Sequence, residues 1–298
     1  MFLVIFLIKL DLVTGFLGSG KTTFIKDYVK YLKSIGESVC VIVNDHGGVN
    51  VDNLFLSNIV DTESIVSDTD PNTTYRRYKT KLIACMLKHY TRVVIEPSGV
   101  FDTDSFFDLA YEDTICNNYT ISNIFAIMEE NYIKDSLVDN ILVNETSHAS
   151  KIIVTKGKGH KTFDINYLNQ IHQKAQSTRT FKEEDLIYKE DIDFKNLMNC
   201  SYKSCDYIKK NINIFETIFV LKKKKSIDNI LEISHLLFSD NSYGKILRMK
   251  GFIKNTDGFI SINLTKNNTD ISKTNIGQEV FIIIGYNMVK EKILKLFD

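Results

Sequence analysis

The chain is poor in the residues that mark several special classes of protein. Its 298 residues include 5 cysteines and 2 prolines, and no two cysteines form a CxxC pair. Disulfide frameworks and zinc ribbons need paired cysteines, so we expect isolated thiols in a reducing compartment. Lys+Arg and Asp+Glu both number 37. This balance gives no sign of a nucleic acid or an anionic membrane as a partner.

Long hydrophobic runs are also scarce. The apolar start MFLVIFLI is followed by Lys9 and Asp11, and it is far shorter than the ~20 residues of a membrane helix. It lacks the basic start and the small-residue cleavage site of a signal peptide. The sequence therefore predicts no membrane span, no signal peptide and a cytoplasmic protein.

The chain has the composition of a globular protein, with 44% hydrophobic and 25% charged residues. Its length favours two domains, which we expect at 1–205 and 206–298, with a polar linker toward the end of 177–211. Apolar runs rich in β-branched residues predict buried strands at 3–14, 38–45, 92–96, 121–128 and 151–155. Helical spacing at 23–35, 79–89 and 134–143 separates some of them. This alternation predicts an α/β fold, with a mostly parallel sheet flanked by helices, and the second domain reads as a small α+β unit.

One motif between the first strand and the first helix indicates chemistry. GFLGSGKT at 15–22 fits the P-loop pattern GxxxxGK[ST] in the context that this pattern requires. Backbone N–H groups of such a loop converge on phosphate oxygens at a helix N-terminus. We expect Lys21 to reach the β- and γ-phosphates as a catalytic group and Thr22 to bind Mg²⁺. The predicted nucleotide-binding residues here are Gly15, Gly18, Ser19, Gly20, Lys21, Thr22 and Thr23.

Two later strand ends complete the predicted site. In VVIEPSG, Glu96 closes a strand as an acidic group near the metal, and Gly99 can approach the γ-phosphate. Asp45 ends the second predicted strand, where it would hold a Mg²⁺-bound water or orient the attacking water. Gly47 and Gly48 would let the following segment move with the state of the γ-phosphate. An ordinary turn after Glu96 and a solvated Asp45 remain the alternatives.

The ordered set of motifs resembles the CobW-type GTPases. The matching segments are VTGFLGSGKTTFI, VIVNDHGGVNVD, VVIEPSG, KIIVTKGKG and, in the second domain, RMKGF and a late IIIG. The resemblance covers nearly the whole chain. It implies a SIMIBI-type G domain with a small α+β C-terminal domain, Mg²⁺ as cofactor, slow GTP hydrolysis and a role in metal or cobalamin-type cofactor delivery. It further implies a client metalloenzyme or corrinoid protein, and it allows a homodimer that no residue here specifies.

Two departures from the family concern metal. The family's CxCC motif corresponds to 63–68, which reads ESIVSD without a cysteine. Hydroxyls and carboxylates bind Zn²⁺ and its neighbours less well than thiolates do, so we expect no high-affinity thiolate site. The family's NEFGE corresponds to NDHGG at 44–48, which keeps the first carboxylate as Asp45 and lacks the second. Any transition metal would need other ligands or a partner.

A third departure concerns the base. The family's NKxD corresponds to Thr155, Lys156, Gly157 and Lys158. The lost carboxylate would accept guanine N–H groups in a charge-assisted bond that contributes roughly 1.5–3 kcal/mol. Thr155 and Lys156 remain as predicted nucleotide contacts, with the Lys156 stem stacked on the base. The resemblance implies that the nucleotide is GTP, and the lysine at position 158 leaves ATP as an alternative.

The main prediction is a Mg²⁺-dependent nucleoside triphosphatase that acts as a switch. Hydrolysis should be slow unaided, because no arginine finger is identifiable and nothing selects Arg76 or Arg77 for that role. A rival is a nucleotide-binding scaffold or activator with little turnover, which the lost thiolates and carboxylate favour. A small-molecule kinase is a third interpretation, against which the missing arginine-rich lid argues.

Three other features receive weaker interpretations. Lys222 to Lys225 predict a solvated turn. Arg248 and Lys250, in the RxKG element, suit either a solvated edge strand or contact with the first domain. The apolar start is longer than the family's first strand, so we expect the natural start near Leu7 or Ile8 at a non-AUG codon.

Overall fold

The computed structural model describes residues 7–45, 56–66, 71–99, 101–157, 161–198, 200–209, 216–221, 225–266, 268–275, 277 and 279–298. Residues 1–6, on which the predicted start depends, lie outside these ranges. Apart from residues 46–51, the chain divides into a first compact unit that reaches Ile212 and a second that begins at Asn213. Each has its own sheet.

The first unit extends past residue 205 because the next residues bond to it. Thr178 N donates to Asp206 O over 2.9 Å and Ile208 N donates to Ala175 O over 2.8 Å. The polar stretch 177–211 is also more ordered than its pattern indicated, since it contains η1 (Glu183–Asp185), β7 (Leu186–Tyr188), η2 (Lys189–Asp191) and α8 (Phe194–Leu197). That 1–205 and 206–298 are the functional domains stays a prediction.

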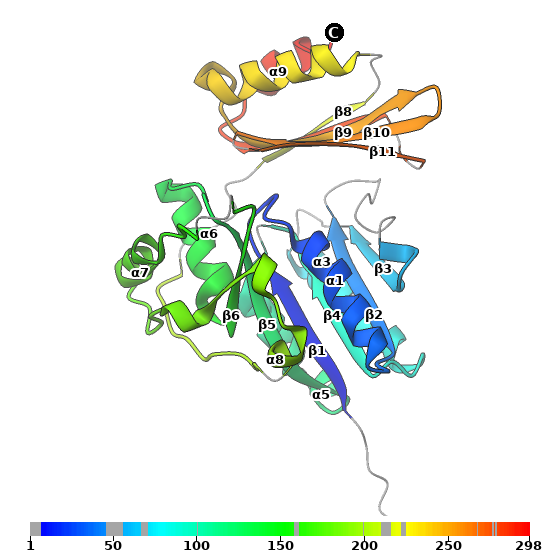
Figure 1. The fold of residues 1–298 in the computed structure, drawn as a ribbon, viewed down its shortest axis with the longest axis vertical. Coiled ribbons are helices and arrows are strands. Elements are labelled where there is room, and N and C mark those ends of the chain that lie inside the picture. The colour runs from blue at the N-terminus through cyan, green and yellow to red at the C-terminus, as the bar shows by residue number, and fades with distance from the viewer. Residues whose placement is uncertain are drawn as a thin grey trace, which may run out of the picture. The chain divides into compact units, whose positions relative to one another are not determined.

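The first unit is built on seven parallel strands in the order β3-β2-β4-β1-β5-β6-β7 (Figure 1). The strands besides β7 are β1 (Ile8–Thr14), β2 (Val39–Asp45), β3 (Asp61–Val66), β4 (Arg92–Glu96), β5 (Tyr119–Glu129) and β6 (Lys151–Thr155). The central strand β1 is buried on both faces, with Leu10, Leu12 and Val13 all 0% exposed. The predicted parallel α/β fold is confirmed. Strands β3 and β7 were not predicted.

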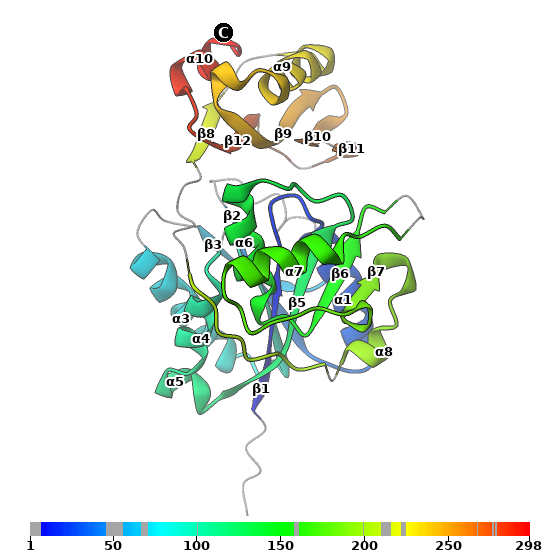
Figure 2. The same ribbon diagram turned by 90° about the vertical axis from the view of Figure 1, so that its left-hand side faces the viewer.

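Helices cover both faces of this sheet. Helix α1 (Lys21–Ser34) packs Phe24 and Tyr28 against Val13 and β2 on one face. The opposite face is covered by α3 (Pro71–Met86), α4 (Thr103–Ala110), α5 (Asp113–Cys116), α6 (Ser136–Ser147) and α7 (Ile165–Lys174). Figure 2 shows α6 and α7 in front of β5 and β6. No helix among the described residues has the length and apolar character to cross a bilayer.

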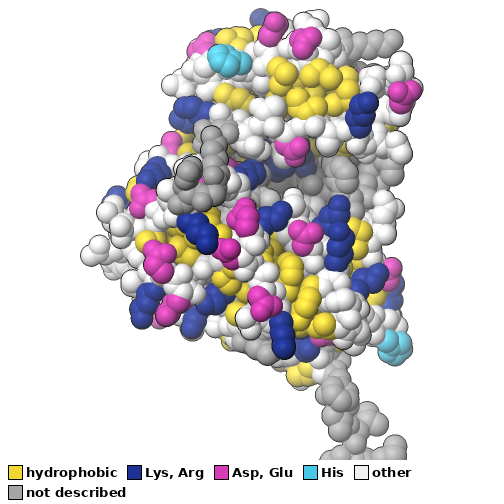
Figure 3. All heavy atoms as spheres, in the orientation of Figure 1, with side chains coloured by type: hydrophobic (Ala, Val, Ile, Leu, Met, Phe, Trp, Pro, Cys, Tyr) yellow, Lys and Arg dark blue, Asp and Glu magenta, His cyan; other side chains and the backbone are white. Residues whose placement is uncertain are grey.

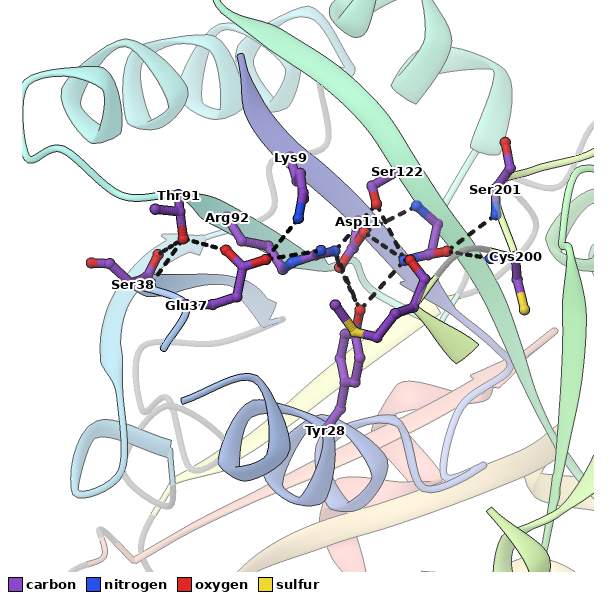
Figure 4. Close-up of polar contacts among 12 residues, drawn as sticks. Lys9, Asp11, Tyr28, Glu37, Ser38, Thr91, Arg92, Ser122, Cys200 and Ser201 are labelled. Atoms are coloured by element: carbon purple, nitrogen blue, oxygen red, sulfur yellow. Dashed lines mark hydrogen bonds and ion pairs between the residues drawn. The ribbon is translucent and has the colours of Figure 1, made fainter. Parts of the chain in front are cut away.

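A buried polar network fastens α1 to the sheet (Figure 4). Arg92 and Asp11 are both 0% exposed, and Arg92 Nη1 donates to Asp11 Oδ2 over 2.6 Å. Tyr28 OH donates to the same oxygen over 2.8 Å, and Asn123 N donates to Asp11 Oδ1 over 3.0 Å. A single carboxylate therefore joins β1, β4, α1 and β5.

The second unit is a five-stranded antiparallel sheet in the order β11-β10-β9-β12-β8. Its elements are β8 (Glu216–Leu221), α9 (Ile227–Ser239), η3 (Asn241–Tyr243), β9 (Lys245–Asn255), β10 (Gly258–Thr265), β11 (Asn268–Thr274), β12 (Val280–Tyr286) and α10 (Lys290–Lys295). Helices α9 and α10 pack Ile230, Leu237 and Ile293 on the sheet. The strand that carries Arg248 and Lys250 lies between β10 and β12, and Lys250 is 6% exposed. The edge-strand interpretation of these two residues was therefore wrong. Residues 222–224 of the lysine run lie outside the described residues.

Candidate functional site

The loop between β1 and α1 has the backbone that a phosphate cradle requires. Gly15, Gly18 and Gly20 have φ values of 144°, 81° and 100°, which only glycine adopts readily. Gly20 caps α1, so the first free N–H groups of the helix point into the loop. A Cβ on Gly15 would collide with the carbonyl oxygen of Ile127. The loop is therefore formed by its glycines and by the end of β5.

Lys21 is folded into the loop. It is 8% exposed, and its Nζ donates to Gly15 O over 2.6 Å and to Phe16 O over 3.4 Å. The loop carbonyls thus hold the ammonium group against the loop. An anionic oxygen placed there would find a desolvated positive charge and the N-terminus of a helix together.

Thr22 and Glu96 meet across the sheet edge. Thr22 Oγ1 donates to Glu96 Oε1 over 2.6 Å, and Glu96 is 4% exposed. A hydroxyl and a carboxylate are hard oxygen ligands of the kind that Mg²⁺ prefers, so these two residues fit that ion. Asp45 ends β2, which pairs with β4 in a register that sets Val43 opposite Glu96. The backbone of Asp45 therefore reaches the same edge, while its side chain and residues 46–52, with Gly47 and Gly48, are not described.

Gly99 lies directly against the P-loop. A Cβ on Gly99 would stand 2.6 Å from Leu17 N and 2.9 Å from Leu17 Cα. Only glycine lets the turn after β4 come this close to the loop backbone. The segment after Glu96 is thus in contact with the cradle.

The end of β6 is tied to the other side of the loop. Thr155 Oγ1 donates to Ser19 O over 2.6 Å, and Lys156 Nζ donates to Gly18 O over 2.6 Å. Lys156 also pairs with Glu129 over 2.8 Å. Ser19 is 2% exposed, whereas Thr23 is exposed on α1. Hydrogen bonds therefore hold the P-loop together with Thr155 and Lys156, the predicted contacts of the nucleotide base. Lys158 lies outside the described residues.

The sequence reasoning missed an acidic residue near this assembly. Glu145 of α6 is 1% exposed, and neither of its carboxylate oxygens has a hydrogen-bond partner among the described residues. Burial raises the pKa of Glu145 well above its ordinary value, and the charge of Lys21 acts in the opposite direction. Val138 and Leu142 precede Glu145 by seven and three residues on the buried side of α6. A carboxylate on an apolar helix face was the signal available.

The structure shows where the stretch that replaces the family's CxCC motif lies. The stretch 63–66, which corresponds to part of the family's CxCC motif, belongs to the edge strand β3. Among the described residues, no group of three or more His, Cys, Asp or Glu side chains is arranged to hold a metal ion. All five cysteines are free, but Cys85 Sγ lies 3.7 Å from Cys40 Sγ, a pairing that the sequence did not indicate.

A glycine loop after a central parallel strand, followed by a helix that begins at Lys-Thr, defines a P-loop nucleotide-binding protein. The family model described as CobW/HypB/UreG, nucleotide-binding domain, matches residues 9–183, and the chain belongs to that family. Family members are GTP-binding proteins. No curated protein sequence matches the chain.

Solved structures give weaker likenesses. Zn(II)-bound YjiA GTPase from E. coli is 17% identical, with a TM-score of 0.40 and 98% of each chain covered. HypB from Helicobacter pylori in complex with nickel is 17% identical, with a TM-score of 0.40, 64% of this chain and 82% of that chain covered. The signal recognition particle receptor FtsY from Elizabethkingia anophelis is 13% identical, with a TM-score of 0.42, 63% of this chain and 61% of that chain covered. None of the three adds to what the family model shows.

Proposed function

We propose that this chain is a Mg²⁺-dependent GTPase that works as a nucleotide switch in metal or metallocofactor delivery, or in the activation of a metalloenzyme. Two observations carry the proposal together: Thr22 contacts Glu96, and the ammonium group of Lys21 is held at the carbonyl of Gly15 in the loop. Family membership adds GTP and the link to metal insertion. The client would be a metalloenzyme or a corrinoid protein, and the location would be the cytoplasm, where free cysteines are stable.

The residues of the site have separate tasks in this proposal. The amides of 15–23 would hold the phosphates, and Lys21 would stabilise charge on the transferred phosphoryl group. Thr22 and Glu96 would hold Mg²⁺ directly or through water, and the ion would neutralise phosphate charge. Asp45 would orient the attacking water.

The state of the γ-phosphate would be signalled by the segments that follow β2 and β4. Gly99 contacts Leu17 in the loop, so a ligand that shifts the loop also shifts the chain from Glu96 to Phe101. The segment from Asp45 to Asp52 is the second proposed switch.

The contacts of the arginines favour slow turnover, because Arg77, Arg92 and Arg179 are bonded to other groups of the protein. Arg92 and Arg179 bond to Asp11 and to Ala149 O, and Arg77 donates to Val66 O. Arg76 is exposed on α3. A nucleotide-dependent activator with little turnover of its own is therefore the second candidate.

Calorimetry with Mg-GTP and Mg-ATP, combined with phosphate-release assays, tests the proposal. Intact chain should bind GTP, and Lys21→Ala should weaken binding at least about tenfold because a charge-assisted contact is lost. Lys26→Ala, on the exposed side of α1, is the matched control and should bind normally. No heat with either nucleotide, or equal binding by Lys21→Ala, would overturn the proposal. Tight binding without release of phosphate would favour the activator.

A further inference from the structure

The second unit contains a pocket of about 580 Å³ between α9 and the ends of β9 and β10. Small-molecule sites usually measure roughly 300–1,000 Å³. The predicted nucleotide site belongs to the first unit, so this pocket is a separate feature.

The pocket exists because α9 carries more apolar surface than the sheet covers. Ile230 and Leu237 are buried against the sheet at 0% and 1% exposure. Leu231 and Phe238, one position further round the helix, are half-buried and line the pocket. Leu264 of β10, at 1% exposure, also lines it. Figure 3 shows hydrophobic side chains gathered on the second unit.

The polar part of the lining is basic. Lys245, at the start of β9, is half-buried, Lys266 follows β10, and His235 projects from α9. No acidic side chain is among the described residues that line the pocket. Cationic groups over an apolar wall suit an anion with a carbon skeleton.

Two hydroxyl residues of the lining do not offer an oxygen to a ligand. Ser234 Oγ donates to Leu231 O over 2.7 Å. Thr265 is part of the lining, but its Oγ1 is fully buried. Recognition of an anion would therefore depend on Lys245 and Lys266.

We propose that this pocket binds a small organic anion. Its phosphate or carboxylate group lies between Lys245 and Lys266, and its apolar or aromatic body packs on Leu231 and Phe238. The ligand therefore binds to the second unit, whereas the proposed nucleotide site belongs to the first.

Fluorescence titration with 1-naphthyl phosphate tests this on the full-length chain. The Lys21→Ala chain is titrated beside the wild type, because this substitution weakens binding of a phosphate by the P-loop. A failure of the proposed GTPase function is then seen separately from a failure of this proposal. We expect saturable binding in both proteins. 1-Naphthol and inorganic phosphate, which each carry half of the recognised chemistry, should bind at least about tenfold more weakly.

Substitutions locate the binding. Lys245→Gln with Lys266→Gln should weaken binding at least about tenfold, because two charge-assisted contacts are lost. Lys254→Gln with Lys273→Gln is the matched control, because both lysines are exposed on the same sheet outside the pocket. Circular dichroism confirms that each variant is folded. No saturable binding, equal binding of inorganic phosphate, or the same loss in the control variant would overturn the proposal.

Discussion

At residue 99 the absence of a side chain decides whether two segments can touch. A Cβ there would lie 2.6 Å from Leu17 N, so Gly99→Ala must push the P-loop backbone away. We expect Mg-GTP affinity to fall at least about tenfold, since small displacements of phosphate-binding groups are expensive. Calorimetry measures the change.

The control for this substitution is Gly36→Ala, after α1. Gly36 also has a positive φ, +87°, but a Cβ there would meet nothing within 4 Å. It should lower stability by about 1 kcal/mol and leave nucleotide affinity unchanged. Wild-type affinity in Gly99→Ala would show that the close approach has no part in binding.

His172 predicts a pH dependence of folding. The ring is 0% exposed between Thr146 Oγ1 and Ser177 Oγ, at 2.8 Å and 2.9 Å. Burial, helped by the charge of Arg179, lowers the pKa of His172 to about 3. Below about pH 6.5 the unfolded chain therefore binds a proton that the folded chain refuses. The free energy of unfolding should fall by up to about 1.4 kcal/mol per pH unit from this group as pH drops from 6.5 toward 3.

Urea unfolding at pH 7.0 and pH 5.5 isolates this contribution. In His172→Gln, the free energy of unfolding should fall by about 1.4 kcal/mol less between pH 7.0 and pH 5.5 than it does in the wild type. This holds whatever the substitution does to stability at pH 7.0. His235→Gln, in which an exposed histidine of α9 is changed, is measured beside it as the matched substitution. Equal slopes for wild type and His172→Gln would mean that this ring takes up its proton without unfolding.

Among the elements, β1, β4 and α1 are joined by the Asp11–Arg92 pair, which has 0% exposure on both sides. Arg92→Leu leaves the Asp11 carboxylate buried without its cation, and loss of one partner in such a pair costs about 3–5 kcal/mol. Urea unfolding measures this loss. Lys9→Ala breaks the pair with Glu37, in which Lys9 is 46% exposed, and should cost at most about 1 kcal/mol. A loss in Arg92→Leu no larger than that of Lys9→Ala would contradict a central role for the pair.

The elements also show what the sequence could predict. Strands β1, β2, β4, β5 and β6 are rich in apolar residues because helices cover both faces, and all five were predicted. Strands β3 (DTESIV) and β11 (NTDISKT) are edge strands, with mostly half-buried side chains in β3 and mostly exposed side chains in β11, so no hydrophobic pattern marks them. Strand β7 has three residues, too few for a periodicity.

The same physical distinction applies to the site. The P-loop is local in sequence, so its spacing and its flanking elements predicted it. The contacts of Thr22 with Glu96, Asp11 with Arg92 and Cys40 with Cys85 join residues far apart in the chain. The strand order sets which of these distant positions meet. Glu96 was predicted because it ends a strand, whereas nothing local marked the buried pairing of Arg92.

At the scale of the whole molecule, each unit has its own hydrophobic core. The first unit has clusters on the two faces of its sheet, and the second has a cluster built from α9, α10 and strands of its own sheet. We expect calorimetry to resolve two unfolding transitions. Mg-GTP at about 100 times its Kd should stabilise the first unit by about 2.7 kcal/mol, which raises its Tm by roughly 5–10 °C.

Two variants assign the transitions. Ile283→Ala removes a side chain with 0% exposure from the core of the second unit. It should lower the free energy of unfolding of the second unit by about 2–5 kcal/mol. The transition of the first unit should still shift when Mg-GTP is added. Lys21→Ala should keep both transitions and lose the shift caused by nucleotide. A single transition that Ile283→Ala and Mg-GTP both move would mean that the units unfold together, because a ligand stabilises whatever unfolds cooperatively with its site.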